Sequence, residues 1–393
     1  MFLPPSPSSS SPPDPQRAAI NRRSLRERIV EVLHYLSDEV DTRRVGGLGE
    51  AQAAGYVAGR LRRADYAASV LSFRAGAGEK ASLALIAALG ALCGAAGAAG
   101  LLTPIPGWLV VLAILLALAT IGLLLAEVEG AEPLRTLLRG TPSQSVVAGR
   151  AATSKQTKAR VVVLAPLDGP PHVVLDRRGL LALLGALLVE AIALTGIVAA
   201  GGQAWRLLAA GCALLLLLLG LWIVSRRTLP APLPAIHGAG ELAALLLIAE
   251  ELTPLATVEV WMIALGGGSV GHESVRALTE RYPFSAQDTW FINLHAISVG
   301  QPVFVTREGR LRERRSHPAL LALATDIDAA DVTIDAEPRR LRQRTLAQSV
   351  LRLGFRTITI SSHNPASPFT SPDAATIERC VRLVVGMIRG LDQ

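Results

Sequence analysis

"VVVLAPLDGPPH", residues 161–172, is the stretch that decides the fold. Its first residues are apolar and rich in valine, which predicts a buried strand, and Gly169-Pro170-Pro171 predicts the loop that ends it. Asp168 stands just past the end of this strand, a position where acids of α/β enzymes often take part in chemistry. The stretch therefore predicts an α/β sheet with a carboxylate at one edge. Asp168 either has partners elsewhere in the chain or only shapes its own turn by accepting backbone N–H bonds.

The composition limits the kind of protein. The chain has 393 residues, half of them hydrophobic, with a formal net charge of +7 and a mean hydropathy of +0.40. A basic chain can bind nucleic acid, but aromatic residues make up only 4% and no arginine stripe is interleaved with them, so no nucleic-acid partner is expected. The three cysteines lack the spacing of a disulfide framework or a metal finger. Residues 1–16 are rich in proline and serine, which predicts a disordered tail without the pattern of a secretory signal.

Four apolar runs are long enough to cross a bilayer, which takes about 20 residues. They cover residues 82–102, 107–126, 179–200 and 207–224. The links "TPIP" and "GGQAWR" join them into two helical hairpins, with Trp108 and Trp205 near the tips, where interfacial aromatic residues are expected. Gly90 and Gly94 form a G-x-x-x-G pattern, a signal for close packing between spans. The lipid bilayer is thus one predicted partner of this chain.

The basic residues predict the orientation of these spans. Those that flank the open ends of the hairpins are Lys80, Arg135, Arg139, Arg177, Arg178, Arg226 and Arg227, whereas the tips carry Arg206. By the positive-inside rule, the protein is a multi-pass membrane protein whose soluble part faces the cytoplasm. Glu190 lies in the middle of the third run, and an intramembrane acid is a functional candidate by default. The alternative is a carboxyl that is protonated or paired with a polar neighbour.

The soluble pieces alternate between helix and strand patterns. Helices are predicted at residues 17–40, 47–64, 239–252, 271–281, 318–325, 345–353 and 373–391, and strands at 69–75, 144–150, 160–166, 257–265, 289–295, 301–306, 331–335 and 356–361. This order predicts a layered α/β/α sheet that is interrupted by the four transmembrane helices. The expected domains are a discontinuous α/β domain of residues 17–80, 128–178 and 226–393, and transmembrane hairpins at 81–127 and 179–225.

"GGGSVG", residues 266–271, matches the dinucleotide pattern G-x-G-x-x-G between a predicted strand and a predicted helix. A dinucleotide site also needs an acid at the end of the next strand, to hold the ribose, and that strand ends in His295. The stretch is therefore predicted to be a turn at a helix N-terminus, whose backbone amides would favour a small anion.

Six stretches, in chain order, resemble the di-zinc aminopeptidases of metallopeptidase family 28. They are "GLGEAQAAGYVAGRL" from Gly47, "QSVVAGR" with "VVVLAPLDG", "AGELAALLLIAEEL" from Ala239, "VEVWMIALGGGSVGHESVRALTERY" from Val258, "FINLHAISVG" from Phe291 and "SPFTSPDAATIE" from Ser367. The resemblance spans nearly the whole soluble part and implies the sheet of that family. It also implies a site in which five side chains hold two zinc ions and a glutamate takes the proton of a shared water.

Carried over position by position, the resemblance implies that most of this site is missing. Pro166 stands where the family has a ligand histidine, and Pro166 has no donor atom. Asp168 keeps the acid that orients that histidine. The acid that bridges the two metals falls on Ile236, with His237 beside it.

The remaining positions give the same picture. The glutamate pair that supplies the base and a ligand falls on Gly268 and Ser269, and the last ligand falls on Phe369. The acid at a strand end falls on His295, which has a donor nitrogen for a metal.

The resemblance thus implies a membrane-embedded, peptidase-like protein whose catalytic apparatus has degenerated. It would act as a binding or scaffold module for an unknown protein or peptide, with no metal or other cofactor expected, as the metal-free transferrin-receptor and nicastrin types of the family imply. The alternative is an active zinc-dependent aminopeptidase or metallohydrolase with a site rebuilt from Asp168, His237 and His295, because three ligands and a water suffice for one catalytic zinc. On either view these three side chains should meet at a residual cleft, within roughly 10 Å of one another.

Overall fold

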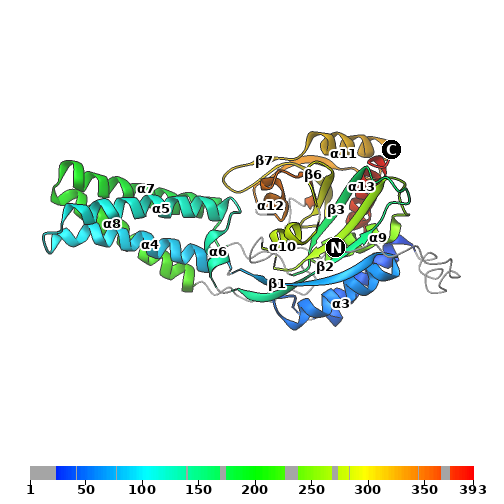
Figure 1. Cartoon of the computed structure of the whole chain (residues 1–393), viewed down its shortest axis with the longest axis horizontal. Helices are drawn as coiled ribbons and strands as arrows, with labels where there is room; N and C mark the ends of the chain where they lie inside the picture. The colour runs from blue at the N-terminus through cyan, green and yellow to red at the C-terminus, as the bar shows by residue number, and fades with distance from the viewer. Residues whose placement is uncertain are drawn as a thin grey trace.

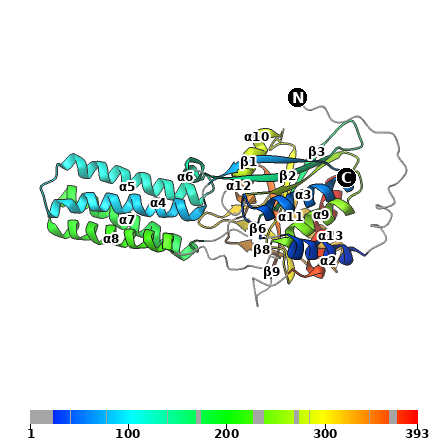
Figure 2. The ribbon, with the colours of Figure 1, turned by 90° about the horizontal axis from the view of Figure 1, so that it is seen from below.

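The computed structural model describes residues 24–40, 42–76, 78–138, 140–168, 174–225, 238–267, 273–282, 284–343, 345–363 and 372–393. These residues form an α/β domain and a bundle of four long helices that projects from one side of it (Figures 1 and 2). The fold class predicted from the sequence is confirmed, because a mixed sheet is layered with helices and four long apolar helices interrupt it.

One sheet of nine strands runs through the described part of the α/β domain. The strands are β1 (Ala67–Ala75), β2 (Thr141–Arg150), β3 (Ala159–Pro166), β4 (Val258–Leu265), β5 (Thr289–Leu294), β6 (Gln301–Glu308), β7 (Arg314–Arg315), β8 (Glu337–Leu341) and β9 (Arg356–His363). Their order is β1-β2-β4-β3-β5-β9-β6-β7, with β8 on the other side of β6. The central strands β4, β3, β5 and β9 are parallel, so their C-terminal ends meet at one edge.

Helices cover both faces of the sheet because β3 is apolar on both. Val161, Val163 and Ala165 face a core shared with helices α2 (Leu25–His34), α3 (Leu48–Arg63), α9 (Ala239–Glu251), α11 (Pro318–Ala330) and α13 (Ala374–Gly390). Val162 and Leu164 face the opposite core, which is shared with α10 (Glu273–Arg281) and α12 (Ala347–Arg352). A continuous apolar run, rather than an alternating one, is what a parallel strand buried on two faces requires.

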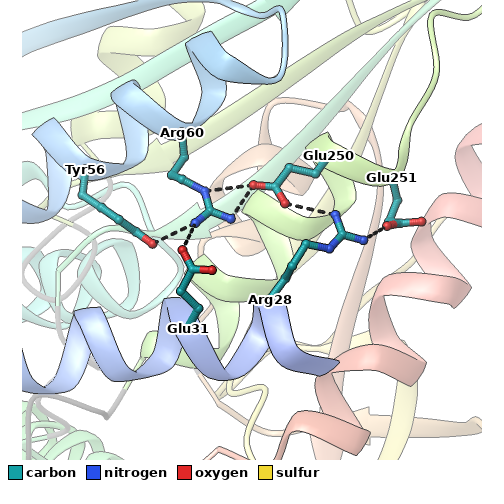
Figure 3. Close-up of polar contacts among 6 residues, drawn as sticks. All are labelled: Arg28, Glu31, Tyr56, Arg60, Glu250 and Glu251. Atoms are coloured by element: carbon teal, nitrogen blue, oxygen red, sulfur yellow. Dashed lines mark hydrogen bonds and ion pairs between the residues drawn. The ribbon is translucent and has the colours of Figure 1, made fainter. Parts of the chain in front are cut away.

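An ion-pair network joins three helices of the first layer (Figure 3). Arg60 on α3 pairs with Glu250 on α9 at 2.6 Å and with Glu31 on α2 at 3.2 Å. Arg28 on α2 pairs with Glu250 at 3.2 Å and also with Glu251. Both arginine side chains are buried, so their charges need these partners.

The bundle consists of α4 (Glu79–Ala98), α5 (Gly107–Val128), α7 (Arg177–Ala200) and α8 (Gln203–Ser225). All four are long and apolar enough to span a membrane. Large apolar side chains such as Leu115, Leu188 and Leu221 face outward rather than into the bundle, as lipid contact requires. The second hairpin link is shorter than expected, because α8 begins at Gln203 and only Gly201 and Gly202 separate it from α7. Both glycines have positive φ, which permits this tight turn.

Glu190 lies inside the bundle. It is 0% exposed, and its two carboxyl oxygens have no hydrogen-bond partner among the described residues. The helix that faces it is α4, where a Cβ on Gly94 would lie 2.4 Å from Glu190 Oε1 and 2.8 Å from the Ala209 carbonyl oxygen. The G-x-x-x-G pattern therefore does allow close packing here, and it makes room for a carboxyl group.

The bundle leaves the domain at the edge where the parallel strands end. β1 runs in the same direction as β4, because each of them is antiparallel to β2. β1 ends at Ala75 and is followed by α4, and β3 ends at Pro166 before α7 begins at Arg177. The chain returns from α5 through the short helix α6 (Pro133–Leu137) to β2. The C-terminal edge of the sheet therefore faces the base of the bundle.

Polar contacts hold the domain against this base. Arg310, in the turn between β6 and β7, donates to Glu79 Oε1 at 2.5 Å and to the carbonyl of Leu175. Arg314 pairs with Glu129, just past α5, at 3.6 Å. Gln348 Nε2 on α12 donates to the Val128 carbonyl at 3.2 Å. These contacts reach the start of α4, the end of α5 and the residues just before α7. The β6–β7 turn therefore lies at the base of the bundle, next to the domain.

The strand predicted at residues 331–335 is wrong. Residues 332–334 form a turn, Asp335 has a left-handed φ of 53°, and the strand of this region is β8, from Glu337. The reason is local, because Asp331 Oδ1 accepts hydrogen bonds from the backbone N–H and the hydroxyl of Thr333. Such side-chain bonds compete with a strand ladder.

Candidate functional site

The candidate site lies at the C-terminal edge of the parallel strands. Leu164 of β3 is paired with Asn293 of β5, so Asp168 and His295 both lie just past the ends of neighbouring strands. Ligands of open α/β sheets bind outside this edge. The other predicted site residues, Ile236, His237, Gly268, Ser269 and Phe369, lie outside the described residues.

Pro166 closes β3 opposite Leu265 of β4. Both residues are buried, and the proline ring brings no donor atom to the edge. The next residue continues the pairing, because the Leu167 N–H donates to the Leu265 carbonyl at 2.8 Å. The backbone is thus held in register at the position where the sequence resemblance expects a ligand histidine.

Asp168 is 0% exposed and interacts with the charge of a buried arginine, Arg43. Arg43 is 4% exposed, and its Nη1 donates to the carbonyl of Gly238 at 3.4 Å. Burial lowers the pKa of the Arg43 guanidinium to about 10, while the carboxylates of Glu241 and Asp168 act in the opposite direction. The group therefore stays protonated at neutral pH. A fixed cation interacts with the acid that would otherwise orient a metal ligand.

Two further buried acids surround this pair. Glu50, in the first turn of α3, accepts hydrogen bonds from the Ser143 hydroxyl and the Gly46 N–H, both at 2.6 Å. Burial raises the pKa of Glu50, and the charge of Asp168 adds to this effect. The first residue of the turn after β4, Gly266, must be a glycine. A Cβ on this residue would lie 2.5 Å from Glu50 Oε1 and 2.1 Å from a backbone oxygen. Close packing thus explains the first glycine of "GGGSVG".

Glu241 connects the two sides of the site. It lies in the first turn of α9, and Gly240 beside it lets the helix approach the Ile297 carbonyl, which a Cβ would meet at 1.9 Å. Its Oε1 accepts the N–H of Ala296, a residue with a left-handed φ of 50° directly after His295, at 2.7 Å. Burial raises the pKa of Glu241, whereas the charge of Arg43 lowers it. Glu241 therefore joins the surroundings of Asp168 to the loop after β5.

His295 has a different set of neighbours. Its backbone N–H donates to the Ile360 carbonyl of β9 at 3.0 Å, and its side chain is hydrogen-bonded to Gln343. Its Nε2 is buried without a hydrogen-bond partner among the described residues. Burial lowers the pKa of this imidazole, and the bond to Gln343 acts against that shift. At a given pH, the neutral form of the His295 ring is therefore more populated than that of a free histidine.

The described residues do not by themselves supply a zinc site. They contain no group of three His, Cys, Asp or Glu side chains placed to hold a metal ion. Pro166 offers no ligand, and the cation beside Asp168 is the guanidinium of Arg43. The described site is instead a buried, hydrogen-bonded charge cluster of Arg43, Glu50, Asp168 and Glu241.

The chain is similar in fold to solved aminopeptidases and to a solved glutaminyl cyclase. The aminopeptidase from Aneurinibacillus sp. strain AM-1 matches with a TM-score of 0.52 at 12% identity, over 95% of each chain. BSAP, a zinc aminopeptidase from Bacillus subtilis, matches with a TM-score of 0.54 at 9% identity, over 94% of this chain and 96% of that one. The glutaminyl cyclase of Macrostomum lignano matches with a TM-score of 0.51 at 11% identity, over 98% of this chain and 95% of that one.

These likenesses show the zinc-aminopeptidase fold and nothing finer. No protein-family model and no curated protein matches the chain.

Proposed function

We propose that this chain is a membrane-anchored binding or scaffold module, built on a zinc-aminopeptidase fold of the family 28 type that has lost its peptidase chemistry. The proposal rests on two observations together, the proline at position 166 and the buried Arg43 that interacts with Asp168. One residue removes a donor atom from the end of β3, and the other supplies a permanent cation beside Asp168. A metal ion placed there would be repelled by the guanidinium, at close range and in a buried setting. The ligand on this view is a protein or peptide, and no cofactor is required.

The test is the metal content and the turnover of the purified full-length protein. After incubation with zinc and desalting in detergent, we expect less than about 0.1 zinc per chain, because a catalytic zinc needs three protein ligands. A panel of aminoacyl-anilides and a peptide with an N-terminal glutamine should show no turnover, with a zinc aminopeptidase as the positive control. Stoichiometric zinc together with turnover that a chelator abolishes would overturn the proposal.

A second candidate is favoured by one observation, the buried and unpartnered Nε2 of His295. In that case Asp168, His237 and His295 hold a single zinc and the chain is an active metallohydrolase. The substitution His295→Ala separates the two proposals. A zinc content that starts near one per chain and falls in this variant supports the hydrolase, whereas metal-free protein in both forms supports the binding module.

We also infer that the soluble part lies on the cytoplasmic side of the membrane. The basic residues described at the base of the bundle, such as Lys80, Arg177 and Arg178, support this orientation, since such residues are retained on the cytoplasmic face. The candidate site would then open toward the inner leaflet, because the C-terminal edge of the sheet faces the bundle.

A further inference from the structure

The end of the sheet formed by β6, β7 and β8 is rich in arginine. Residues 306–315 and 337–343 together contain eight arginines and three glutamates. Two of these glutamates are already engaged, since Glu308 is buried between Thr345 and Thr359 and Glu313 pairs with Arg342. The strands β6, β7 and β8 therefore carry a large excess of positive charge at a surface.

The strand register gathers part of this charge into a row. Arg307 of β6 is directly opposite Arg315 of β7 on one side and opposite Arg340 of β8 on the other. Residues that are directly opposite lie on the same face of a sheet, with Cβ atoms about 5 Å apart. Arg315 and Arg340 are exposed and Arg307 is half-buried. We call these three residues the arginine row.

The stability of the sheet does not explain why three arginines lie in this row. Like charges directly opposite each other destabilise a sheet. In the described part of the chain, none of the three guanidinium groups forms an ion pair with a carboxylate. The neighbouring arginines differ, because Arg310 and Arg314 have acidic partners in Glu79 and Glu129. An anion from outside the chain would balance the charge of the row.

The position of the row indicates which anion this is. Arg315 follows Arg314, whose partner Glu129 lies directly after the apolar helix α5. Consecutive strand residues point to opposite faces, so Arg315 lies beside this contact with its side chain on the other face of the sheet. The β6–β7 turn also touches the first residue of α4 through Arg310. The row thus lies at the level where apolar helices meet the membrane surface, within reach of lipid headgroups.

We propose that the arginine row binds the phosphate headgroup of an anionic phospholipid in the leaflet next to the domain. The guanidinium group suits this ligand, because its planar fork donates two hydrogen bonds to phosphate oxygens and keeps its charge. Basic residues next to membrane spans are attracted to anionic lipid, at roughly fivefold in affinity for each arginine. The inference requires that the bundle spans a membrane, and it is independent of whether the peptidase site is active.

The test uses the full-length protein in a neutral maltoside detergent, titrated with dioctanoyl phosphatidylglycerol or, as a neutral control, dioctanoyl phosphatidylcholine. The triple variant Arg307→Gln, Arg315→Gln, Arg340→Gln should need on the order of 100-fold more phosphatidylglycerol for half-saturation than the unaltered protein. The single variant Arg340→Gln, at an exposed position, should bind phosphatidylglycerol about fivefold more weakly. Binding of the unaltered protein should weaken as salt is raised.

A matched control removes the same charge elsewhere. Arg63, Lys155 and Lys158 are exposed and lie near the start of β1 and β3, outside the strands β6, β7 and β8. Their replacement by glutamine should leave phosphatidylglycerol binding unchanged. Without lipid, the triple variant of the row should unfold at the same temperature as the unaltered protein or a higher one, because the substitutions relieve repulsion.

Three results would overturn the proposal. The first is equal phosphatidylglycerol binding by the triple variant and the unaltered protein. The second is competition by inorganic phosphate at equal concentration, which would indicate a site for free anions. The third is tighter binding of a 20-nucleotide single strand through the same arginines, which would assign the row to nucleic acid.

Discussion

Substituting Arg43 by methionine tests the charge cluster at the candidate site. Arg43 is 4% exposed, and it lies in the field of Asp168 and Glu241, which are 0% and 5% exposed. Removing one partner from a buried charge cluster leaves the other charges without a nearby opposite charge, which costs about 3–5 kcal/mol. We expect the free energy of unfolding of the α/β domain to fall by this amount at pH 8. The double variant Arg43→Met, Asp168→Asn should recover at least about 1 kcal/mol, because the two residues are coupled.

The loss should depend on pH. Burial already raises the pKa of Glu241, and Arg43 lowers it, so removing Arg43 raises it further. An acid whose pKa is raised in the folded state binds more protons folded than unfolded, and stability falls as pH rises from its unfolded value through its folded one. The variant should therefore lose more stability at pH 8 than at pH 5, because protonation of Glu241 becomes more favourable as pH falls.

Urea unfolding of the full-length protein in detergent, followed by tryptophan fluorescence, measures this effect, since Trp261 and Trp290 lie in the sheet. Arg44→Met is the matched control, because Arg44 is the next residue and is exposed. Its loss should stay within about 0.5 kcal/mol. Equal effects of the two substitutions, or an Arg43→Met effect that is the same at both pH values, would refute the charge cluster.

Three shorter predictions follow from other parts of the molecule. Burial raises the pKa of Glu308 to about 7, so stability is lost as pH rises from its unfolded value of about 4.5 through 7. Glu308→Gln should thus gain on the order of 2 kcal/mol at pH 8 and little at pH 5 in urea titrations, and an unchanged pH slope would contradict this. Gly94→Leu should lower the thermal midpoint of the bundle, because the added side chain crowds Glu190 at a cost of about 1–3 kcal/mol. Gly122→Leu should leave the midpoint unchanged, because a Cβ on Gly122 meets nothing within 4 Å, and equal shifts in the two variants would argue against close packing at Gly94. A cysteine at Gly202 should be labelled only from outside the cell and one at Arg312 only from inside, and the reverse pattern would overturn the orientation.

Local patterns were enough to predict most of the fold. The apolar run before Asp168 became β3, and "GLGEAQAAGYVAGRL" became α3, because burial on two faces and helical spacing are visible in neighbouring residues. The strand predicted at residues 331–335 is absent, since Thr333 donates two hydrogen bonds to the Asp331 carboxylate and these bonds hold the segment in a turn. Side-chain bonds to the backbone leave little trace in hydrophobic periodicity.

The candidate site was predictable only in part. Asp168 and His295 follow strand patterns, and their placement past neighbouring strand ends follows from a parallel sheet. Arg43, Glu50 and Glu241 were missed, because they come from a loop and two helix starts whose proximity to Asp168 is set by the tertiary fold. A signal existed in the acids at the first turns of two helices, where positive helix ends favour a carboxylate.

The interruption of the sheet by the bundle has a consequence for biosynthesis. β1 and β2 are made before α7 and α8, but their sheet neighbour β4 follows only after both hairpins, at Val258–Leu265. At about 5–20 residues per second, the ribosome needs roughly 5–25 s to pass from Arg150 to Leu265. A two-stranded ribbon is marginally stable in water, so it must wait through this interval with its edge unpaired. The first apolar hairpin, α4 and α5, lies between β1 and β2 in the chain and holds their adjoining ends near each other during the delay. All four long helices are thus made before the sheet can be completed, and the α/β domain closes onto a base that the bundle has already formed.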